Sequence, residues 1–526
     1  MTSQPISAGP ISVGRRSHHP LLAVVAVLLG AYMTNFHSRL FSTGLADLRG
    51  AFGLGMDEGS WLNSVAMAPQ IFIAPCVAWL VVVFGVRRVL VVPAFLYALL
   101  CLAIPLLRDP GMVLVLHVLQ GLLLGLFVPA TISIILRNLP MKWWAPAIAI
   151  YVFRQAFAIN SGVELVGLYV GQWGWQWLYW QDVVLAPLLA LCAYYGAPRE
   201  PANRELLAEA DWGGMLLFGA GLAMLYIGLD QGNRLDWLSS GLVVGLLAGG
   251  VLLLLLFCVN EALVPQPWAS ASVVLSRNIG LLLLVATLYT VTSISNSTLI
   301  PNFLTSVAHL RPEQTGPLLL HYGALPLFVV MPLSVWLLGR IDGRLMITIG
   351  LAAFALAAWM GTRLTHDWGP GDFTGMVLIQ SLGHCFTFLP VVLLSLANVN
   401  PARATAISAY IQVLRVDGVA LAGALTSTWL RQSEQVHSNL IGLHVEQGDP
   451  GVTALLSQLT HRFAGSAGDA GAKALSTLSG FVQREATVLS YIDGFWLCFW
   501  VALVAILLTA LIGRAPVSPF TPARGR

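Results

Sequence analysis

Long runs of apolar residues alternate with short polar segments along almost the whole chain. A membrane-spanning helix needs about 20 mostly apolar residues, and runs of about that length recur throughout. Because backbone polar groups in lipid must be paired within their own segment, we expect each run to form an α-helix. The fourteen predicted spans are residues 21–41, 59–82, 89–107, 111–136, 145–170, 177–195, 212–229, 239–259, 279–303, 316–338, 345–362, 373–397, 404–430 and 491–513.

Composition excludes a soluble globular protein. Of the 526 residues, 57% are hydrophobic and only 10% are charged, and the mean hydropathy is +0.78. Soluble domains carry roughly 25% charged residues. The net charge of +3 says little about partners. Because the basic residues are placed as topology signals, we expect the lipid bilayer, and no nucleic acid, as a partner of this chain.

The distribution of Lys and Arg between the loops predicts the orientation of the protein. With an even number of spans, both termini lie on one side of the membrane. Fifteen basic residues fall in the loops and tails on that side and five in the short loops opposite. Since cytoplasmic loops are enriched in basic residues, we expect a multi-pass protein of the cell inner membrane with both termini in the cytoplasm.

The spans and loops divide the chain into six parts. These are a cytoplasmic tail (1–20), a six-helix bundle (21–195), a cytoplasmic linker (196–211), two inserted helices (212–259), a second six-helix bundle (279–513) and a cytoplasmic tail (514–526). "AWLVVVFGVRR" (Ala78–Arg88) and "VWLLGRIDGRL" (Val335–Leu345) end equivalent spans in the two bundles. Such repeated halves are typical of secondary transporters.

The second bundle contains the one long extracytoplasmic loop, residues 431–490. Near its end, Leu475, Leu478, Phe481 and Val482 are spaced as on one face of a helix. We expect an amphipathic helix there, resting on the bundle or on a partner protein.

Four segments resemble the fourteen-span drug/proton antiporters of the major facilitator superfamily, the EmrB/QacA type. They are "LDQGNRLDWLSS" (Leu229–Ser240), "SRNIG" (Ser276–Gly280), "LIQSLGHCFTFLP" (Leu378–Pro390) and "FVQREATVLSYIDGFW" (Phe481–Trp496). The resemblance implies an all-α membrane protein with a major facilitator fold, two six-helix bundles plus two inserted helices. It also implies a rocker-switch exporter driven by protons, with a small-molecule substrate and no cofactor. The last segment is most similar to members that work with a periplasmic membrane-fusion adaptor and an outer-membrane channel.

The loop after the second span matches the family's conformational-switch motif only in part. Val82 stands where the motif usually has an acid. The residues assigned to this motif in the two halves are Gly85, Arg87, Arg88, Arg340 and Arg344.

Four ionisable residues within the spans are candidates for proton coupling, because charges inside a membrane are costly and usually functional. Glu164 follows the polar residues Asn160 and Ser161 by about one turn; a static ion pair with Arg154 or Arg39 is the alternative. The other three candidates are Asp182, Asp417 and His117. Asp182 could instead be a structural group at a helix end, and His117 a packing residue. We expect His321 and His384 to be packing residues.

The candidate substrate cavity contains more polar groups than an ordinary helix interface. Tyr32, Asn35, Arg39 and Ser42 are spaced to lie on one face of the first span, although Arg39 could instead extend to the membrane surface. The further cavity candidates are Arg154, Gln412 and Arg415. The balance of buried cations and acids favours anionic or weakly acidic substrates.

The residues offer no alternative energy source or metal site. A GxxxxGK[ST] phosphate loop is absent from the sequence, and no Cys or His pairs show metal-ligand spacing. We therefore expect a transporter and not an enzyme, exporting amphipathic or weakly acidic toxic compounds. The alternatives are a transporter of one specific metabolite anion and, less favoured, a membrane-embedded transferase.

Overall fold

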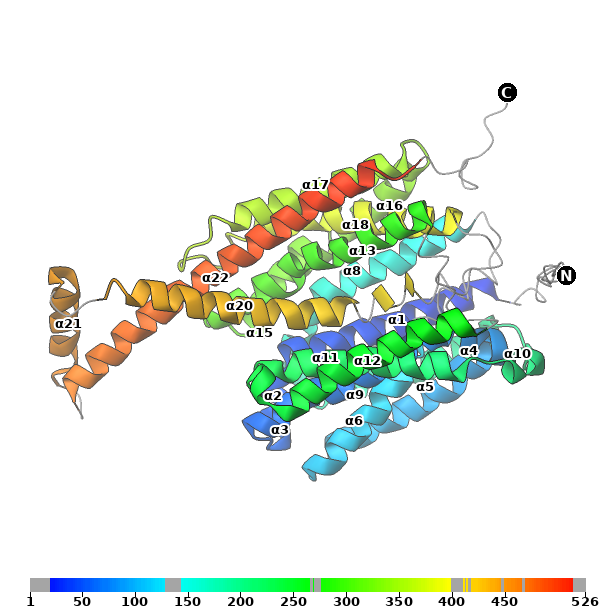
Figure 1. Ribbon diagram of the computed structural model, residues 1–526, viewed down its shortest axis with the longest axis horizontal. Helices are drawn as coiled ribbons and strands as arrows, with labels where there is room; N and C mark the ends of the chain where they lie inside the picture. Colours follow the sequence, from blue (N-terminus) through cyan, green and yellow to red (C-terminus); the bar gives the residue numbers. More distant parts are fainter. Residues whose placement is uncertain are drawn as a thin grey trace.

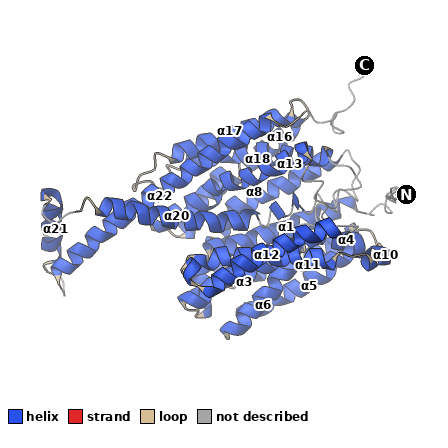
Figure 2. Ribbon diagram, viewed as in Figure 1, coloured by secondary structure: helices blue, strands red, loops and turns tan. Residues whose placement is uncertain are grey.

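The computed structural model describes residues 19–127, 143–264, 268, 276–398, 410–411, 413–414, 418–445, 449–465 and 469–513. Within these ranges the regular elements are helices and there is no strand (Figure 2). The all-α prediction is confirmed. The α-helices are α1 (Pro20–Thr43), α2 (Leu45–Phe52), α3 (Met56–Ile73), α4 (Val77–Phe84), α5 (Val86–Ala103), α6 (Pro110–Leu124), α8 (Trp144–Leu168), α9 (Trp177–Gly196), α10 (Arg204–Ala208), α11 (Trp212–Gly232), α12 (Gly241–Leu263), α13 (Arg277–Ile294), α14 (Ile300–Ser306), α15 (Pro312–Leu318), α16 (Leu327–Leu338), α17 (Gly343–Gly361), α18 (Thr374–Ala397), α20 (Gly418–Gly442), α21 (Pro450–Phe463) and α22 (Ala470–Ala510).

Short segments of tighter or wider helix join several of these elements. The 3₁₀ segments are η1 (Ala74–Cys76), η2 (Ile104–Leu106) and η5 (Trp237–Ser239). The π-helical segments are η4 (Tyr169–Trp173), η6 (Ser295–Leu299) and η7 (Leu319–Ala324). Since π-helical turns occur mostly at functional sites, η6 and η7 direct attention to the helices that contain them.

Eleven helical stretches in the described part of the chain are long and apolar enough to cross a membrane. A further apolar helix, α6, is shorter than a full span. The predicted total of fourteen spans stays a prediction, because some predicted spans run into residues that the structure does not describe.

The helices form two halves that meet along a seam (Figure 1). The first half comprises α1–α9 and the second half α13–α22. Helix α8 lies at the seam: it packs against α1 on one side and against α15, η7, α16 and α18 on the other. The start of α1 and the end of α22 lie at the same end of the bundle, which we call the terminal end.

The inserted pair α11 and α12 packs outside the first half but touches both halves. On α3, Asn63 donates to the Tyr226 hydroxyl of α11 at 2.9 Å. Just after α11, Asn233 donates to the Thr428 hydroxyl of α20 at 3.0 Å. The insertion therefore bridges the halves at the end opposite the terminal end.

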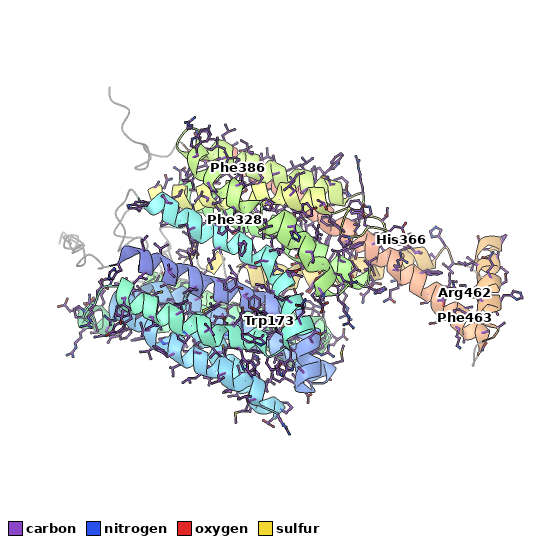
Figure 3. The ribbon with its side chains drawn as sticks, turned by 180° about the vertical axis from the view of Figure 1, so that it is seen from behind. Trp173, Phe328, His366, Phe386, Arg462 and Phe463 are labelled. Atoms are coloured by element: carbon purple, nitrogen blue, oxygen red, sulfur yellow. The ribbon has the colours of Figure 1, made fainter. Side chains whose placement is uncertain are left out.

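At that opposite end, α20 and α22 project beyond the bundle as a long hairpin with α21 across its tip, where Arg462 and Phe463 lie (Figures 1 and 3). We call this the hairpin end. The predicted amphipathic segment at 475–482 is helical, but it is the first part of α22, a continuous helix of 41 residues. The expected helix is therefore present, and it continues without a break into the last predicted span. That it rests on the bundle or on a partner protein stays a prediction.

Candidate functional site

Glycines bring the backbones of α8 and α15 into contact at the seam. A Cβ added to Gly167 would lie 2.8 Å from the backbone nitrogen of Glu313. One added to Gly316 would lie 2.5 Å from the Cα of Glu164. Only residues without a side chain allow so close an approach. The two halves are thus in backbone contact toward the hairpin end.

Arg39 reaches the second half because a proline leaves a carbonyl group free there. Pro301 follows the π-helical segment η6 and has no backbone N–H. The carbonyl of Ser297, four residues earlier, therefore lacks the donor that an α-helix would supply. The Arg39 guanidinium donates to this oxygen at 2.5 Å, and Arg39 is only 7% exposed. The charge lies inside the protein and not at the membrane surface.

Next to this contact, a chain of buried polar side chains crosses the seam. Asn296 of η6 donates to the side-chain oxygen of Asn160 on α8 at 3.0 Å. The same Asn296 nitrogen lies 3.5 Å from Nε2 of His384 on α18. On the other side of the ring, Nδ1 of His384 lies 2.8 Å from the hydroxyl of Tyr289 on α13. Asn160, Asn296 and His384 are each 1% exposed or less.

A second proline produces a similar free carbonyl in η7. Pro326 cannot donate to the carbonyl of Tyr322, four residues earlier. The Ser381 hydroxyl of α18 lies 3.1 Å from that oxygen and 2.9 Å from the Gly323 carbonyl. A Cβ on Gly323 would collide with the side chain of Asn160. The π-helical segment thus packs directly beside the Asn160–Asn296 hydrogen bond.

Glu164, the first proton-coupling candidate, lies one turn along α8 from Asn160. Its side chain is partly exposed, yet its Oε2 atom is buried and has no hydrogen-bond partner among the described residues. The static ion pair with Arg154 or Arg39 does not occur in the structure, whose described residues give Glu164 no salt bridge.

Asp182 and His117 lie together inside the first half, away from the seam. Asp182 accepts a hydrogen bond from the Tyr97 hydroxyl at 2.8 Å, while its Oδ1 atom has no partner in the described part of the chain. Nε2 of His117 lies 2.9 Å from the Tyr179 hydroxyl, and its Nδ1 lies 2.7 Å from the Val113 carbonyl. Both candidates are buried among groups that move with one half.

Of the cavity candidates, Tyr32 and Asn35 are partly exposed and Arg154 is buried. Tyr32 stacks on Phe36 with 6.0 Å between ring centroids. The Arg154 guanidinium packs on the Tyr151 ring, 4.8 Å from its centroid, and Arg154 is 3% exposed. Its two terminal nitrogens have no partner among the described residues. Arg154 therefore offers buried donors that an anionic group could use.

Three candidates lie outside the described residues: Asp417, Gln412 and Arg415. A narrow, mainly apolar pocket lies between α8 and the second half. Gln155 of α8 lines it together with Tyr289 and Thr290 of α13, Ser395 of α18 and Ile411.

The candidate switch-loop residues lie at the terminal end. Gly85 has φ +80°, a conformation that favours glycine. The Arg87 guanidinium lies 3.3 Å from the centroid of the Tyr194 ring, and Arg88 is exposed. In the second half, the Arg340 guanidinium lies 3.8 Å from the centroid of the Trp336 ring.

Arg344 is the member of this set that joins two helices at the terminal end. It pairs with Asp342 at 2.7 Å and donates to the Ile512 carbonyl near the end of α22 at 2.9 Å. The same contact therefore ties the start of α17 to the last helix.

Sequence reasoning missed Asn296 and Tyr289 and assigned His384 to packing. A signal was present: "SISNSTLIP" (Ser293–Pro301) places five hydroxyl or amide side chains in a predicted span, just before a proline. Such a stretch must find hydrogen-bond partners inside the membrane. Which helices would supply them is a matter of tertiary packing.

The described residues contain no group of three or more His, Cys, Asp or Glu that could hold a metal ion. The buried chemistry at the seam therefore consists of hydrogen bonds and single charges.

Comparison with known proteins shows the family. The model of the Major Facilitator Superfamily matches residues 22–423. The probable multidrug resistance protein EmrY of Escherichia coli (strain K12) is 24% identical over 503 residues, covering 94% of this chain and 95% of EmrY. The fatty acid resistance protein FarB of Neisseria gonorrhoeae is 23% identical over 430 residues, covering 81% of this chain and 84% of FarB.

Solved structures share the fold. The proton:xylose symporter XylE superposes with a TM-score of 0.54 at 12% identity, covering 95% of this chain and 97% of XylE. An auto-inhibited peptide transporter of the POT family gives a TM-score of 0.56 at 15% identity, covering 95% of this chain and 98% of that one. The major facilitator fold is confirmed. The chain belongs to the Major Facilitator Superfamily.

Proposed function

We propose that this chain is a proton-coupled antiporter that exports amphipathic or weakly acidic toxic compounds across the inner membrane. The observation that carries the proposal is the seam itself, where the buried Arg39 and the partly exposed Glu164 bring ionisable groups to a contact between the two halves. A charge placed there can bind a substrate or a proton and change how the halves fit together. The names of the relatives, which include multidrug export and resistance proteins, support the direction of transport.

The substrate class follows from the cations inside the first half. Arg154 keeps two buried nitrogens without partners in the described structure, and Arg39 uses a backbone carbonyl as acceptor. Planar guanidinium groups suit carboxylates and other planar anions. An exporter of weakly acidic aromatic or acyl compounds fits this arrangement, and the name of FarB, a fatty acid resistance protein, agrees with it.

The hairpin supports a further part of the proposal, a periplasmic adaptor that hands substrate to an outer-membrane channel. Val436 and Leu440 on α20 and Leu443 in the turn directly after it are 55%, 50% and 69% exposed, and the two helical residues are spaced to lie on one side of the helix. An exposed apolar stripe beyond the bundle is typical of a protein interaction site. With the hairpin end in the periplasm, the terminal end and both chain termini lie in the cytoplasm.

Transport in proteoliposomes tests the proposal. We expect an outwardly directed substrate flux that depends on an imposed pH gradient and collapses with a protonophore. A susceptibility panel that compares deletion and overexpression strains would identify the compounds. Flux that ignores the pH gradient would contradict proton coupling, and a response to a single metabolite anion alone would favour the specific transporter.

Reporter fusions test the orientation. Fusions after Arg344 and at the C-terminus should report the cytoplasm, and a fusion near Gly465 should report the periplasm. Replacing residues 442–471 by a short linker should spare transport in vesicles but weaken resistance in intact cells and reduce co-purification of an adaptor. If resistance and co-purification both persist, the hairpin has no adaptor role.

A further inference from the structure

His384 of the second half lies directly behind the Asn160–Asn296 contact between the halves, and its two ring nitrogens have different partners. Asn296 presents its amide nitrogen, which can only donate, so Nε2 of His384 is the acceptor. Nδ1 therefore carries the ring proton and donates to the Tyr289 hydroxyl at 2.8 Å. This arrangement of partners is the one that a neutral imidazole satisfies.

A second proton on the His384 ring is incompatible with the Asn296–Asn160 contact. A proton on Nε2 would face the N–H group of Asn296, so two donors would lie opposite each other without an acceptor. Rotation of the Asn296 amide would restore a bond to Nε2, because its Oδ1 atom is buried and has no partner in the described part of the chain. That rotation would bring the Asn296 oxygen against the Asn160 oxygen, acceptor against acceptor.

Asn160 is not free to compensate. Its amide nitrogen donates to the Ala156 carbonyl of its own helix at 2.8 Å, and Gly323 packs against its side chain. Turning its amide would break the first contact and disturb the second. Breaking the Asn296–Asn160 hydrogen bond, which joins the two halves, therefore costs less free energy than turning the Asn160 amide when the His384 ring is protonated.

The groups around the His384 ring are compatible with a site that releases its proton when the halves are in contact. Arg39 of α1 donates to the carbonyl of Ser297, the residue next to Asn296, and so brings a positive charge to the same part of the seam. The nearest acid on α8 is Glu164, one turn from Asn160. From α17, the neighbour is the Phe354 ring, 4.9 Å between centroids. The groups facing the ring from α13 and η6 are Tyr289 and Asn296.

We propose that His384 is a proton-carrying residue of this transporter, and that its protonation is incompatible with the Asn296–Asn160 contact that closes the seam. Proton binding to His384 opens the hairpin end, and closure of the hairpin end expels the proton by the same coupling. Asn296 and Asn160 are positioning residues that connect the ring to the first half. The inference rests on the proposed proton coupling and assigns it a site.

The test measures opening of the hairpin end directly, in the full-length protein in lipid. Spin labels on Arg108→Cys in the first half and Thr365→Cys in the second half report the distance between exposed loops. In the otherwise unchanged protein, lowering the pH from about 8 to about 5.5, a range that spans the titration of histidine, should add a longer-distance population. His384→Gln, which cannot take a proton, should keep the shorter distance at both pH values.

Two further variants keep the test decisive. Asn160→Ala removes the seam contact in either protonation state and should show the longer distance at both pH values. Combined with His384→Gln, it should still open, which shows that the His384→Gln protein is folded and able to move. His444→Gln, a change at an exposed histidine on the hairpin, is the matched control and should respond to pH as the parent does.

A pH response that survives in His384→Gln would overturn the inference. Proteoliposome transport separates this failure from failure of the proposed function. If export by the parent protein depends on the pH gradient and His384→Gln exports equally well with an unchanged pH response, protons couple elsewhere. If the parent itself ignores the gradient, the proposed antiport is wrong and not merely its proton site.

Discussion

Two buried polar clusters in this protein have similar chemistry and different positions. In the first half, Asp182 pairs with Tyr97 and His117 with Tyr179. At the seam, Asn296 links Asn160 of one half to His384 of the other. In a rocker-switch transporter the halves move largely as rigid bodies, so partners within one half stay together and partners across the seam must separate.

Position therefore decides which cluster can couple a proton to movement. A proton taken up by Asp182 or His117 changes the energy of one half in both conformations, and a ligand that does not distinguish two states shifts nothing. A proton taken up at the seam meets different partners when the halves are closed and when they are open. Burial of an ionisable group in a membrane protein is a sign of function, but only a contact that breaks during the cycle makes it a switch.

The largest effect should come from Glu164, the carboxylate on the first-half side of the seam. We propose that Glu164 exchanges a proton in the same cycle as His384, so Glu164→Gln, which removes the charge while keeping the shape, should abolish proton-driven export and change substrate binding only a few-fold. Flux in proteoliposomes and equilibrium binding measure the two quantities separately. Proton-driven export that persists in this variant would leave the coupling to other residues.

Export should depend on close packing of the two halves at Gly316 nearly as strongly as on the Glu164 charge. Gly316→Val places a branched side chain where a Cβ alone would lie 2.5 Å from the Glu164 Cα. Overpacking of this kind costs about 1–3 kcal/mol, which corresponds to a loss of export of about fivefold to 150-fold. Gly423→Val, at a glycine with nothing within 4 Å of its Cβ position, is the matched control. Equal transport by the two variants, at equal expression, would contradict close contact at the seam.

The buried cluster of the first half (Asp182, Tyr97, His117 and Tyr179) should contribute to stability and not to proton coupling. Asp182→Asn or Tyr97→Phe disturbs a buried hydrogen bond, so the free energy of unfolding should fall by about 1–3 kcal/mol. Thermal unfolding in detergent measures this loss. The pH dependence of export should stay as in the parent, and a shifted pH profile in Asp182→Asn would place proton coupling in the first half after all.

Arg39→Lys should have a moderate and selective effect. The change keeps the positive charge but loses the planar group that donates to the Ser297 carbonyl. Export of acidic substrates should fall, while export of neutral ones should change less. Arg39→Ala should reduce export of acidic substrates further without lowering the amount of protein in the membrane. Unchanged export by both variants would remove Arg39 from the substrate path.

The local fold was accessible to sequence reasoning because lipid imposes a simple rule on each span. Apolar runs had to be helices, and the polar spacing on α1 and α8 identified Arg39 and Glu164. The seam was not accessible, since Asn160, Asn296 and His384 come from three spans and their meeting depends on how the halves pack. The continuity of α22 was not accessible either: the apolar spacing near residues 475–482 predicted a helix there, but not that it runs on into the last span as one helix of 41 residues.

The smallest effect concerns Asp47 on α2, outside the predicted membrane spans. Partial burial raises the pKa of Asp47, the Glu313 carboxylate raises it further, and Arg311 opposes the shift. Because the pKa is raised when the halves are in contact, protonated Asp47 favours contact and ionised Asp47 disfavours it. This contribution to closure is therefore gained as the pH falls through the raised pKa and is absent at higher pH, opposite in sign to the effect proposed for His384.

Asp47→Asn removes the ionised form and should stabilise the closed hairpin end slightly near neutral pH. With the labels at positions 108 and 365, the variant should show fewer long distances than the parent at neutral pH and the same number in acid, where Asp47 is protonated in both. Glu209→Gln, at an exposed carboxylate near the linker, should leave the distances unchanged at every pH. A larger long-distance population in Asp47→Asn would mean that the Asp47 carboxylate holds α2 to the second half through Arg311, instead of repelling Glu313.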